Sequence, residues 1–259
     1  MPDPTIVASG VTYRVQDATL ISDVGLEVSP GELVAVIGPN GAGKSTLLGL
    51  LSGSLVPTRG EVLLNGINTA SAHPGDLATE RSILTQREPF DIPYTVAQVV
   101  EMGRFPHRRD AANTRERDEA AVADAMAQTD TTRFANRAYA TLSKGEQTRV
   151  SLARIIAQAT PIILLDEPTT ALDVAHQERI MRRALQLARQ QRTTVVVLHD
   201  LNAAAVYAER VVLMSRGVVV ADGPPRVVLE AEILSEVYNQ SMVVVDHPFR
   251  HCPLVLTAD

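Results

Sequence analysis

Short apolar runs alternate with longer amphipathic stretches along much of this chain. Residues 33–37 and 162–165 contain only Leu, Ile, Val and Ala, and residues 193–198 are rich in valine. Runs of this length, separated by helical spacing such as that of residues 174–190, are typical of parallel strands buried on both faces. The pattern therefore predicts an α/β fold around a mainly parallel sheet.

The beginning of the chain predicts a different kind of sheet. Residues 5–15 and 19–28 are rich in Val, Ile, Leu and Thr and end at a turn over residues 29–31. They predict N-terminal antiparallel strands that lead into the parallel sheet. A second turn, over residues 58–60, predicts a further strand over residues 61–64.

The middle and the end of the chain depart from the strand pattern. Residues 96–157 are rich in alanine and charged side chains at helical spacing, which predicts a helical insert. Residues 211–214 and 218–221 flank a Ser-Arg-Gly turn signal and predict a terminal hairpin. Beyond it, residues 228–238 predict one short helix.

These patterns together predict one domain that covers residues 1–259. Its α/β core consists of residues 1–85 and 158–225, and a helical subdomain over residues 86–157 interrupts the core. Residues 226–259 form a C-terminal extension. With 259 residues, of which 45% are apolar, the chain can bury a sizeable core.

Composition and charge narrow the classes of partner. A net charge of −6 argues against a basic face for nucleic acid, so we expect no nucleic-acid partner. No apolar run approaches the roughly 18 residues that span a bilayer, and the N-terminus lacks the pattern of a secretory signal. The single cysteine, Cys252, permits no internal disulfide. We therefore expect a soluble cytoplasmic protein.

The strongest chemical signal lies at residues 38–45, which read GPNGAGKS between a predicted strand and a predicted helix. Glycines let the backbone wrap closely around phosphate, and the helix presents its positive end to the anion. Lys44 can reach the β- and γ-phosphates, and the Ser45 hydroxyl can ligate Mg²⁺. The segment predicts a nucleoside triphosphate site that uses Pro39, Asn40, Gly41, Ala42, Gly43, Lys44, Ser45 and Thr46.

Two further segments fit such a site. Asp166 ends the apolar run 162–165, where it could anchor Mg²⁺, and Glu167 could orient or deprotonate an attacking water. Residues 142–146 read LSKGE, in which Ser143 and Glu146 have the spacing of a capping box at a helix start.

In their order along the chain, these segments resemble the nucleotide-binding subunit of an ATP-binding-cassette (ABC) transporter. The resemblance covers residues 6–222 and implies a P-loop NTPase fold of the ABC-ATPase type that binds ATP and Mg²⁺. The matching positions are residues 38–45, 142–146, Asp166, Glu167, residues 171–173 and His199.

The resemblance also implies individual roles. Tyr13 matches the aromatic side chain that stacks on adenine. Gln86 matches the glutamine that contacts Mg²⁺ and the attacking water and begins the segment facing the permease, and His199 matches the histidine at the γ-phosphate. The implied catalytic residues are Glu167, His199, Lys44 and Gln86, and the implied metal ligands are Ser45, Gln86 and Asp166.

In this family ATP lies between two cassettes. The resemblance therefore implies a homodimer in which Ser143, Gly145 and Glu146 of one copy complete the ATP site of the other, with Asp173 at the seam. Two helix N-termini would then face one triphosphate from opposite sides. The family usually has glycine where this chain has Lys144, which leaves the backbone geometry of that segment open.

Two classes of function compete for such an ATPase. Soluble cassette ATPases of DNA maintenance or translation usually carry coiled-coil inserts, zinc-binding cysteines or two cassettes, and this sequence has one cassette and one cysteine. Residues 99–107, with the sequence VVEMGRFPH, are similar to importers of iron chelates, haem and cobalamin. The resemblance favours a haem importer, with a ferric-siderophore or cobalamin importer as the alternative.

A transport function implies further partners. We expect two copies of the chain beneath a transmembrane permease dimer, fed by an extracytoplasmic substrate-binding protein. The chain would then be peripheral, at the cytoplasmic face of the cell membrane. His247 and Cys252 lie beside prolines in the tail, and we do not expect them to bind haem or metal.

Overall fold

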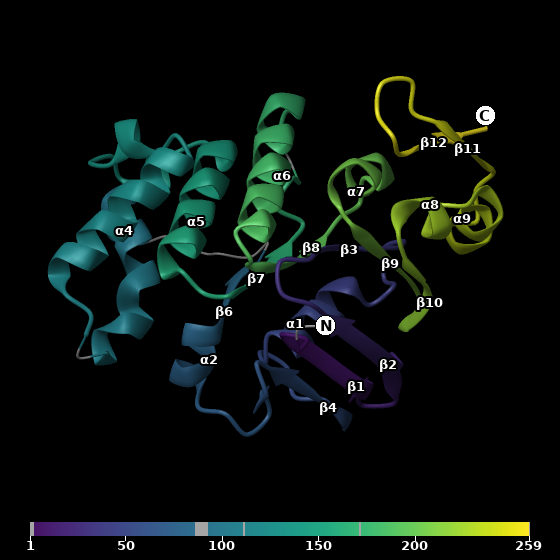
Figure 1. Ribbon diagram of the computed structural model, residues 1–259, viewed down its shortest axis with the longest axis horizontal. Helices are drawn as coiled ribbons and strands as arrows, with labels where there is room; N and C mark the ends of the chain where they lie inside the picture. The colour runs from purple at the N-terminus through teal and green to yellow at the C-terminus, as the bar shows by residue number, and fades with distance from the viewer. Residues whose placement is uncertain (1–2, 86–92, 111, 171, 259) are drawn as a thin grey trace.

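The central element of the computed structural model is a six-stranded sheet in the order β10-β9-β3-β8-β7-β6 (Figure 1). The structure describes residues 3–85, 93–110, 112–170 and 172–258. Neighbouring strands are parallel except for the β9-β10 hairpin. The predicted α/β fold around a mainly parallel sheet is confirmed. The strands are β3 (Leu33–Ile37), β6 (Arg81–Leu84), β7 (Ile162–Asp166), β8 (Thr193–Val197), β9 (Arg210–Ser215) and β10 (Val218–Gly223).

A smaller antiparallel sheet, in the order β2-β1-β4-β5, comes from the first part of the chain. Its β4 starts earlier than expected, because Arg59, placed in a turn by the sequence, already pairs with Thr12 across a register shift. The turn after β4 contains Asn65 and Gly66, which both have positive φ angles. The strands are β1 (Ile6–Val15), β2 (Ala18–Val28), β4 (Arg59–Leu64) and β5 (Ile67–Asn68).

Alternation along the parallel strands divides the core into two layers. In β3, Val34 and Val36 face helix α1 (Lys44–Leu51) and the antiparallel sheet, whereas Leu33 and Ala35 face the other side. Both sets are fully buried, as expected for a strand covered on both faces. Helix α1 is therefore held between the two sheets, and its N-terminus is fixed at the end of β3.

Helices cover the opposite face of the parallel sheet (Figure 1). Helices and 3₁₀ helices lie between residues 96 and 158, where the sequence predicted a helical insert, and the last of them ends at Gln158. The elements are α3 (Val96–Glu101), η1 (Met102–Arg109), α4 (Arg115–Gln128), η2 (Thr132–Phe134), η3 (Tyr139–Thr141), α5 (Lys144–Gln158), α6 (Val174–Arg189) and α7 (Leu201–Tyr207), where η marks a 3₁₀ helix. Helix α2 (Pro74–Glu80) instead buries Leu77 in the layer that contains α1.

The C-terminal residues form two helices and a hairpin against this layer. The short helix predicted over residues 228–238 begins three residues later, at Ala231, because Leu229 lies outside the helical conformation and buries its side chain in the core. The elements are α8 (Pro225–Val228), α9 (Ala231–Tyr238), β11 (Met242–Asp246) and β12 (Pro253–Thr257). Strands β11 and β12 pair only with each other, as an antiparallel hairpin.

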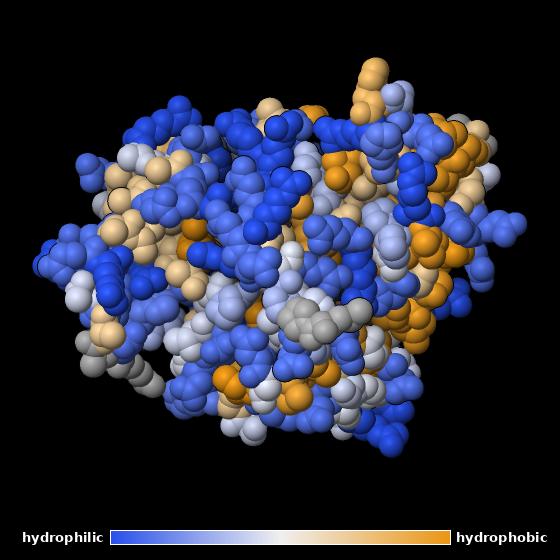
Figure 2. Space-filling view, in the orientation of Figure 1, coloured by the Kyte–Doolittle hydropathy of each residue, from blue (hydrophilic) through white to orange (hydrophobic). Residues whose placement is uncertain are grey.

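The surface differs between the two ends of the molecule. Figure 2 shows mostly hydrophilic side chains over α4 to α6 and apolar side chains gathered near β10 and the C-terminal elements. Exposed valines there include Val220, Val227 and Val243. Within the described ranges, no helix combines the length and the apolar character needed to cross a bilayer.

Two arginine–carboxylate pairs in the helical region differ in burial and predict different contributions to stability. Arg104 Nε lies 2.7 Å from Asp118 Oδ1, its Nη1 donates to the Ala157 carbonyl at 2.7 Å, and its side chain is 8% exposed. Arg104→Met should lower the free energy of unfolding by about 3 kcal/mol, because it leaves a half-buried carboxylate without its cation.

The exposed pair between Arg115 and Glu119 is the matched control, with an arginine side chain 87% exposed. Arg115→Met should leave the free energy of unfolding close to that of the wild type, because water solvates both charges of an exposed pair. Urea denaturation of both variants measures the difference, and equal effects would contradict the assignment of a structural role to Arg104.

Candidate active site

The glycine loop leaves β3 at Gly38 and enters α1 at Lys44, as the sequence predicted. Gly38 has a φ of +147°, and a Cβ there would lie 2.2 Å from the Met214 carbonyl oxygen. Gly43 has a φ of +98° and would place a Cβ 2.9 Å from the carbonyl oxygen of Leu20. Both glycines are therefore required for the loop to pack against its neighbouring strands.

The Lys44 side chain lies beneath this loop and is buried. Its ammonium donates hydrogen bonds to the carbonyl oxygens of Gly38 at 2.8 Å and Pro39 at 3.0 Å. Burial lowers the pKa of Lys44, whereas the nearby carboxylates of Glu167 and Asp166 act in the opposite direction. The ammonium is thus directed toward the loop and held close to two acidic groups.

Asp166, the last residue of β7, lies across from the start of α1. The Ser45 hydroxyl donates a hydrogen bond to Asp166 Oδ1 at 3.0 Å. Burial raises the pKa of Asp166, and the hydrogen bond from Ser45 opposes this shift. Two hard oxygen ligands therefore lie side by side at the carboxyl ends of the parallel strands, a donor set that suits Mg²⁺.

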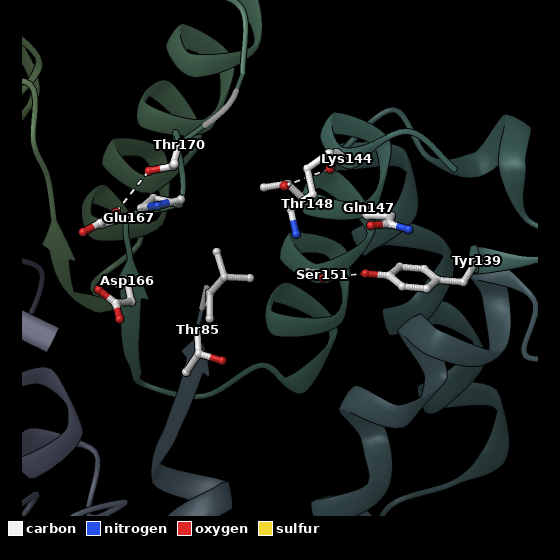
Figure 3. A pocket seen from close by; sticks show the side chains of 11 residues that line it. Thr85, Tyr139, Lys144, Gln147, Thr148, Ser151, Asp166, Glu167 and Thr170 are labelled. Atoms are coloured by element: carbon white, nitrogen blue, oxygen red, sulfur yellow. Dashed lines mark hydrogen bonds between the residues drawn. The ribbon is translucent and has the colours of Figure 1, made fainter. Parts of the chain in front are cut away.

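Glu167 follows Asp166 but turns its side chain another way (Figure 3). Its backbone has a φ of +49°, and its amide donates to the Val197 carbonyl at 3.2 Å. One carboxylate oxygen contacts His199 Nε2, and the other accepts a hydrogen bond from the Thr170 hydroxyl at 3.2 Å. The structure therefore brings Glu167 and His199 together from the ends of two adjacent strands.

A cavity of about 430 Å³ opens over the glycine loop. Its lining contains residues 40–46 and Glu167, together with Arg216 from the β9-β10 turn. Sequence reasoning did not find Arg216, because its Ser-Arg-Gly segment indicates only a hairpin turn. Tyr13 does not line this cavity; it is partly buried and packs against the core cluster that contains α1 and the antiparallel sheet. Its predicted contact with adenine stays a prediction.

A second cavity, of about 200 Å³, lies between α5 and the end of β7 (Figure 3). Asp166 and Glu167 line one side, and Lys144 and Thr148 of α5 line the other, with Thr85 below them. The helical region and the parallel sheet thus face each other across the acidic pair. Lys144, the departure from the family pattern, lies at the wall of this cavity.

The predicted capping box at the start of α5 is confirmed. Ser143 Oγ accepts from the Glu146 amide at 3.3 Å, and Glu146 Oε2 accepts from the Ser143 amide at 2.8 Å. Ser143, Gly145 and Glu146 do not line the cavity at the glycine loop of their own chain. Asp173 caps α6 instead, and accepts a hydrogen bond from the His176 amide at 2.9 Å. Gln86 lies outside the described residues, whose first long range ends at Thr85.

This fold and site define a class of protein. A glycine loop between a parallel strand and a helix, with an acidic pair at the end of a second parallel strand of the same sheet, is the arrangement of a P-loop NTPase. Residues 21–170, more than half of the chain, match the ABC transporter family. The chain belongs to this family and is one of its ATP-binding, ATP-hydrolysing subunits.

Named relatives lie close in sequence. The chain is similar to the hemin import ATP-binding protein HmuV of Nocardia farcinica, at 48% identity over 96% of this chain and 84% of that protein. It is also similar to HmuV of Thermobifida fusca, at 48% identity over 92% of this chain and 83% of that protein. These relatives therefore match almost the whole chain, beyond the ABC segment alone.

Solved structures agree with this fold. A transporter described as metal-chelate type, in an inward-facing conformation, matches with a TM-score of 0.85 at 25% identity over 99% of this chain and 98% of that one. The dimeric bacterial ABC transporter cassette MJ0796 matches with a TM-score of 0.76 at 31% identity over 85% of this chain and 98% of that one.

One tyrosine of the C-terminal extension lies near the glycine loop, and its burial predicts a pH dependence of stability. Burial raises the pKa of Tyr238 on α9 to about 12, and the backbone of Gly38 partly offsets this shift. The pKa of a tyrosine in the unfolded chain is about 10. Between this pH and the higher pKa of the folded protein, the folded protein keeps the proton and the unfolded chain loses it. Wild-type stability should therefore fall as pH rises from about 10 to about 12.

Tyr238→Phe should remove this part of the alkaline loss. The quantity to compare is the free energy of unfolding of the variant minus that of wild type. Between pH 8 and pH 11 this difference should shift by about 1 kcal/mol in favour of the variant. Urea denaturation of both proteins at the two pH values measures the change. An unchanged difference would show that the phenol is not buried in the folded protein.

Proposed function

We propose that this chain is the ATPase subunit of a haem importer, in which ATP hydrolysis drives transport through a partner permease. The observation that carries the proposal is the identity of 42–48% with hemin import ATP-binding proteins over at least 92% of the chain. The match extends beyond residues 21–170, which carry the family match, into most of the rest of the chain. The metal-chelate type description of a structural neighbour supports the same class of cargo.

The chemistry proposed for the site is in-line attack of water on the γ-phosphate of ATP. Lys44 and the loop amides would hold the β- and γ-phosphates, and Tyr13 would stack on adenine. Ser45, Asp166 and Gln86 would hold Mg²⁺, which neutralises phosphate charge when bound. The Ser45–Asp166 distance of 3.0 Å supports this ligand pair.

Glu167 and His199 would act on the attacking water and the γ-phosphate. Glu167 would accept a proton from the water, and its contact with His199 supports a shared position for the two side chains. His199 would in turn donate a hydrogen bond to the γ-phosphate. Arg216 lines the same cavity and would add positive charge beside the phosphates.

A second copy of the chain would complete each site. Ser143, Gly145 and Glu146 lie outside the glycine-loop cavity of their own chain, which supports a role toward the partner's nucleotide. The capped start of α5 would then face the triphosphate opposite the start of α1. Loss of the γ-phosphate would remove the group that both copies bind, and the dimer would open.

The proposed assembly places this dimer at the cytoplasmic face of the cell membrane. A permease dimer would contact the helical subdomain, residues 86–157, and an extracytoplasmic binding protein would deliver the cargo. The core, residues 1–85 and 158–225, would hydrolyse ATP, and residues 226–259 would form the C-terminal extension. A ferric siderophore or cobalamin is the alternative cargo.

The proposed base predicts a separation of binding from turnover. Glu167→Gln should retain ATP binding, lower kcat by about 10³-fold or more, and accumulate as an ATP-bound dimer, because the amide cannot accept the proton. Glu178→Gln, on the surface of α6, is the matched control and should turn over normally. Size-exclusion chromatography and phosphate release measure both properties. Wild-type turnover by Glu167→Gln would refute the role of this carboxylate.

The cargo is tested by transport itself. Liposomes that contain the complete complex with its permease should take up haem when ATP is supplied inside, together with the binding protein outside. The same liposomes with Glu167→Gln should not. Uptake of ferric siderophore or cobalamin in place of haem would keep the ATPase assignment and overturn the choice of cargo.

A further inference from the structure

Helix α7 begins directly after His199 and controls where that histidine lies. Asp200 caps the helix: its Oδ1 accepts hydrogen bonds from the amides of Asn202 at 2.8 Å and Ala203 at 3.1 Å. Only one peptide unit separates His199 from the capping residue. A rotation or a tilt of α7 therefore moves the histidine relative to Glu167.

The C-terminal hairpin holds this helix through a paired hydrogen bond. Asn202 Nδ2 donates to the Val255 carbonyl at 3.1 Å, and Asn202 Oδ1 accepts from the Val255 amide at 2.8 Å. Val255 lies in β12, and its side chain is buried. One amide side chain thus pairs with both backbone groups of one residue, which fixes its orientation as well as its distance.

Apolar packing and the polar pair together restrain α7, because Leu201, Ala203, Val206 and Tyr207 are partly buried against the core. The helix has seven residues, and a helix of this length depends on tertiary contacts for its stability. Of its side chains, only the small Ala204 and Ala205 are fully buried. The polar pair with Val255 adds a directional restraint to this packing, because hydrogen bonds depend on orientation and apolar contacts do not.

The hairpin also borders the space beside the acidic pair. A cavity of about 420 Å³ has Glu167 and His199 on one side and His247 and Arg250, from the loop between β11 and β12, on the other. The C-terminal extension therefore approaches the Glu167–His199 contact in two ways. Its β12 strand binds Asn202 of α7, and its loop between β11 and β12 lines a cavity that Glu167 and His199 also line.

We infer that Asn202 is a positioning residue for hydrolysis: its pairing with Val255 holds α7 so that His199 stays in contact with Glu167. The C-terminal extension thereby sets the rate of the chemical step without touching the nucleotide. This inference rests on the role proposed above for His199.

Steady-state kinetics of Asn202→Ala in the full complex test the inference. kcat should fall about tenfold, a loss in the range of two neutral hydrogen bonds, while KM for ATP stays unchanged because the glycine loop is untouched. In a His199→Ala background, the same substitution should cause no further loss, because its effect passes through that side chain. A merely structural role would lower kcat in both backgrounds.

Two further variants control for stability. Arg226→Ala removes the 2.9 Å bond from Arg226 to Asp246 in β11, on the same hairpin but away from α7, and should leave kcat unchanged. Asn202→Asp keeps the acceptor for the Val255 amide and loses the donor, so kcat should lie between those of wild type and Asn202→Ala. If Asn202→Ala does not fold, the kcat of Asn202→Asp tests the positioning role in its place.

The outcomes separate this inference from the proposed function. Wild-type turnover by His199→Ala refutes the role of His199. If His199→Ala is slow but Asn202→Ala or Asn202→Asp turns over at the wild-type rate, only the positioning role is overturned. An equal loss from Asn202→Ala in both backgrounds also overturns it.

Discussion

Parallel register at the centre of the large sheet is the constraint on which the rest of this structure depends. Val36 of β3 is paired with Val197 of β8, and Val197 is also paired with Asp166 of β7. Three strands therefore end at one edge of the sheet, and the residues that follow them meet there. Segments more than a hundred residues apart form one site for this reason alone.

That edge gathers charges that the core disfavours. Burial lowers the pKa of Lys44 and raises the pKa of Asp166, so each group is partly desolvated in its ionised form. The carboxylates of Glu167 and Asp166 are the opposite charges that act on Lys44. Lys44 is in turn the first opposite charge that acts on Asp166. Such an arrangement is costly in an empty site and favours a ligand that carries both an anion and a metal. The site thus favours the triphosphate of ATP beside Lys44, and the Mg²⁺ proposed above would complement Asp166.

The layers around this edge leave two directions of control. On one side, α5 and Lys144 face the acidic pair across the cavity of Figure 3. On the other, α7 and the C-terminal hairpin approach the same pair through His199. Both layers border Glu167, whereas α1 is packed between the two sheets.

Local sequence by itself determined the elements and the loop chemistry. The apolar runs predicted β3, β7 and β8, and the GPNGAGKS segment predicted the glycine loop, because periodicity and glycine content act over a few residues. Tertiary structure alone decided that Arg216 lines the cavity, that the buried Leu229 separates α8 from α9, and that Asn202 pairs with Val255. These depend on contacts between segments distant in sequence, for which a turn signal or an asparagine in a helix carries no information.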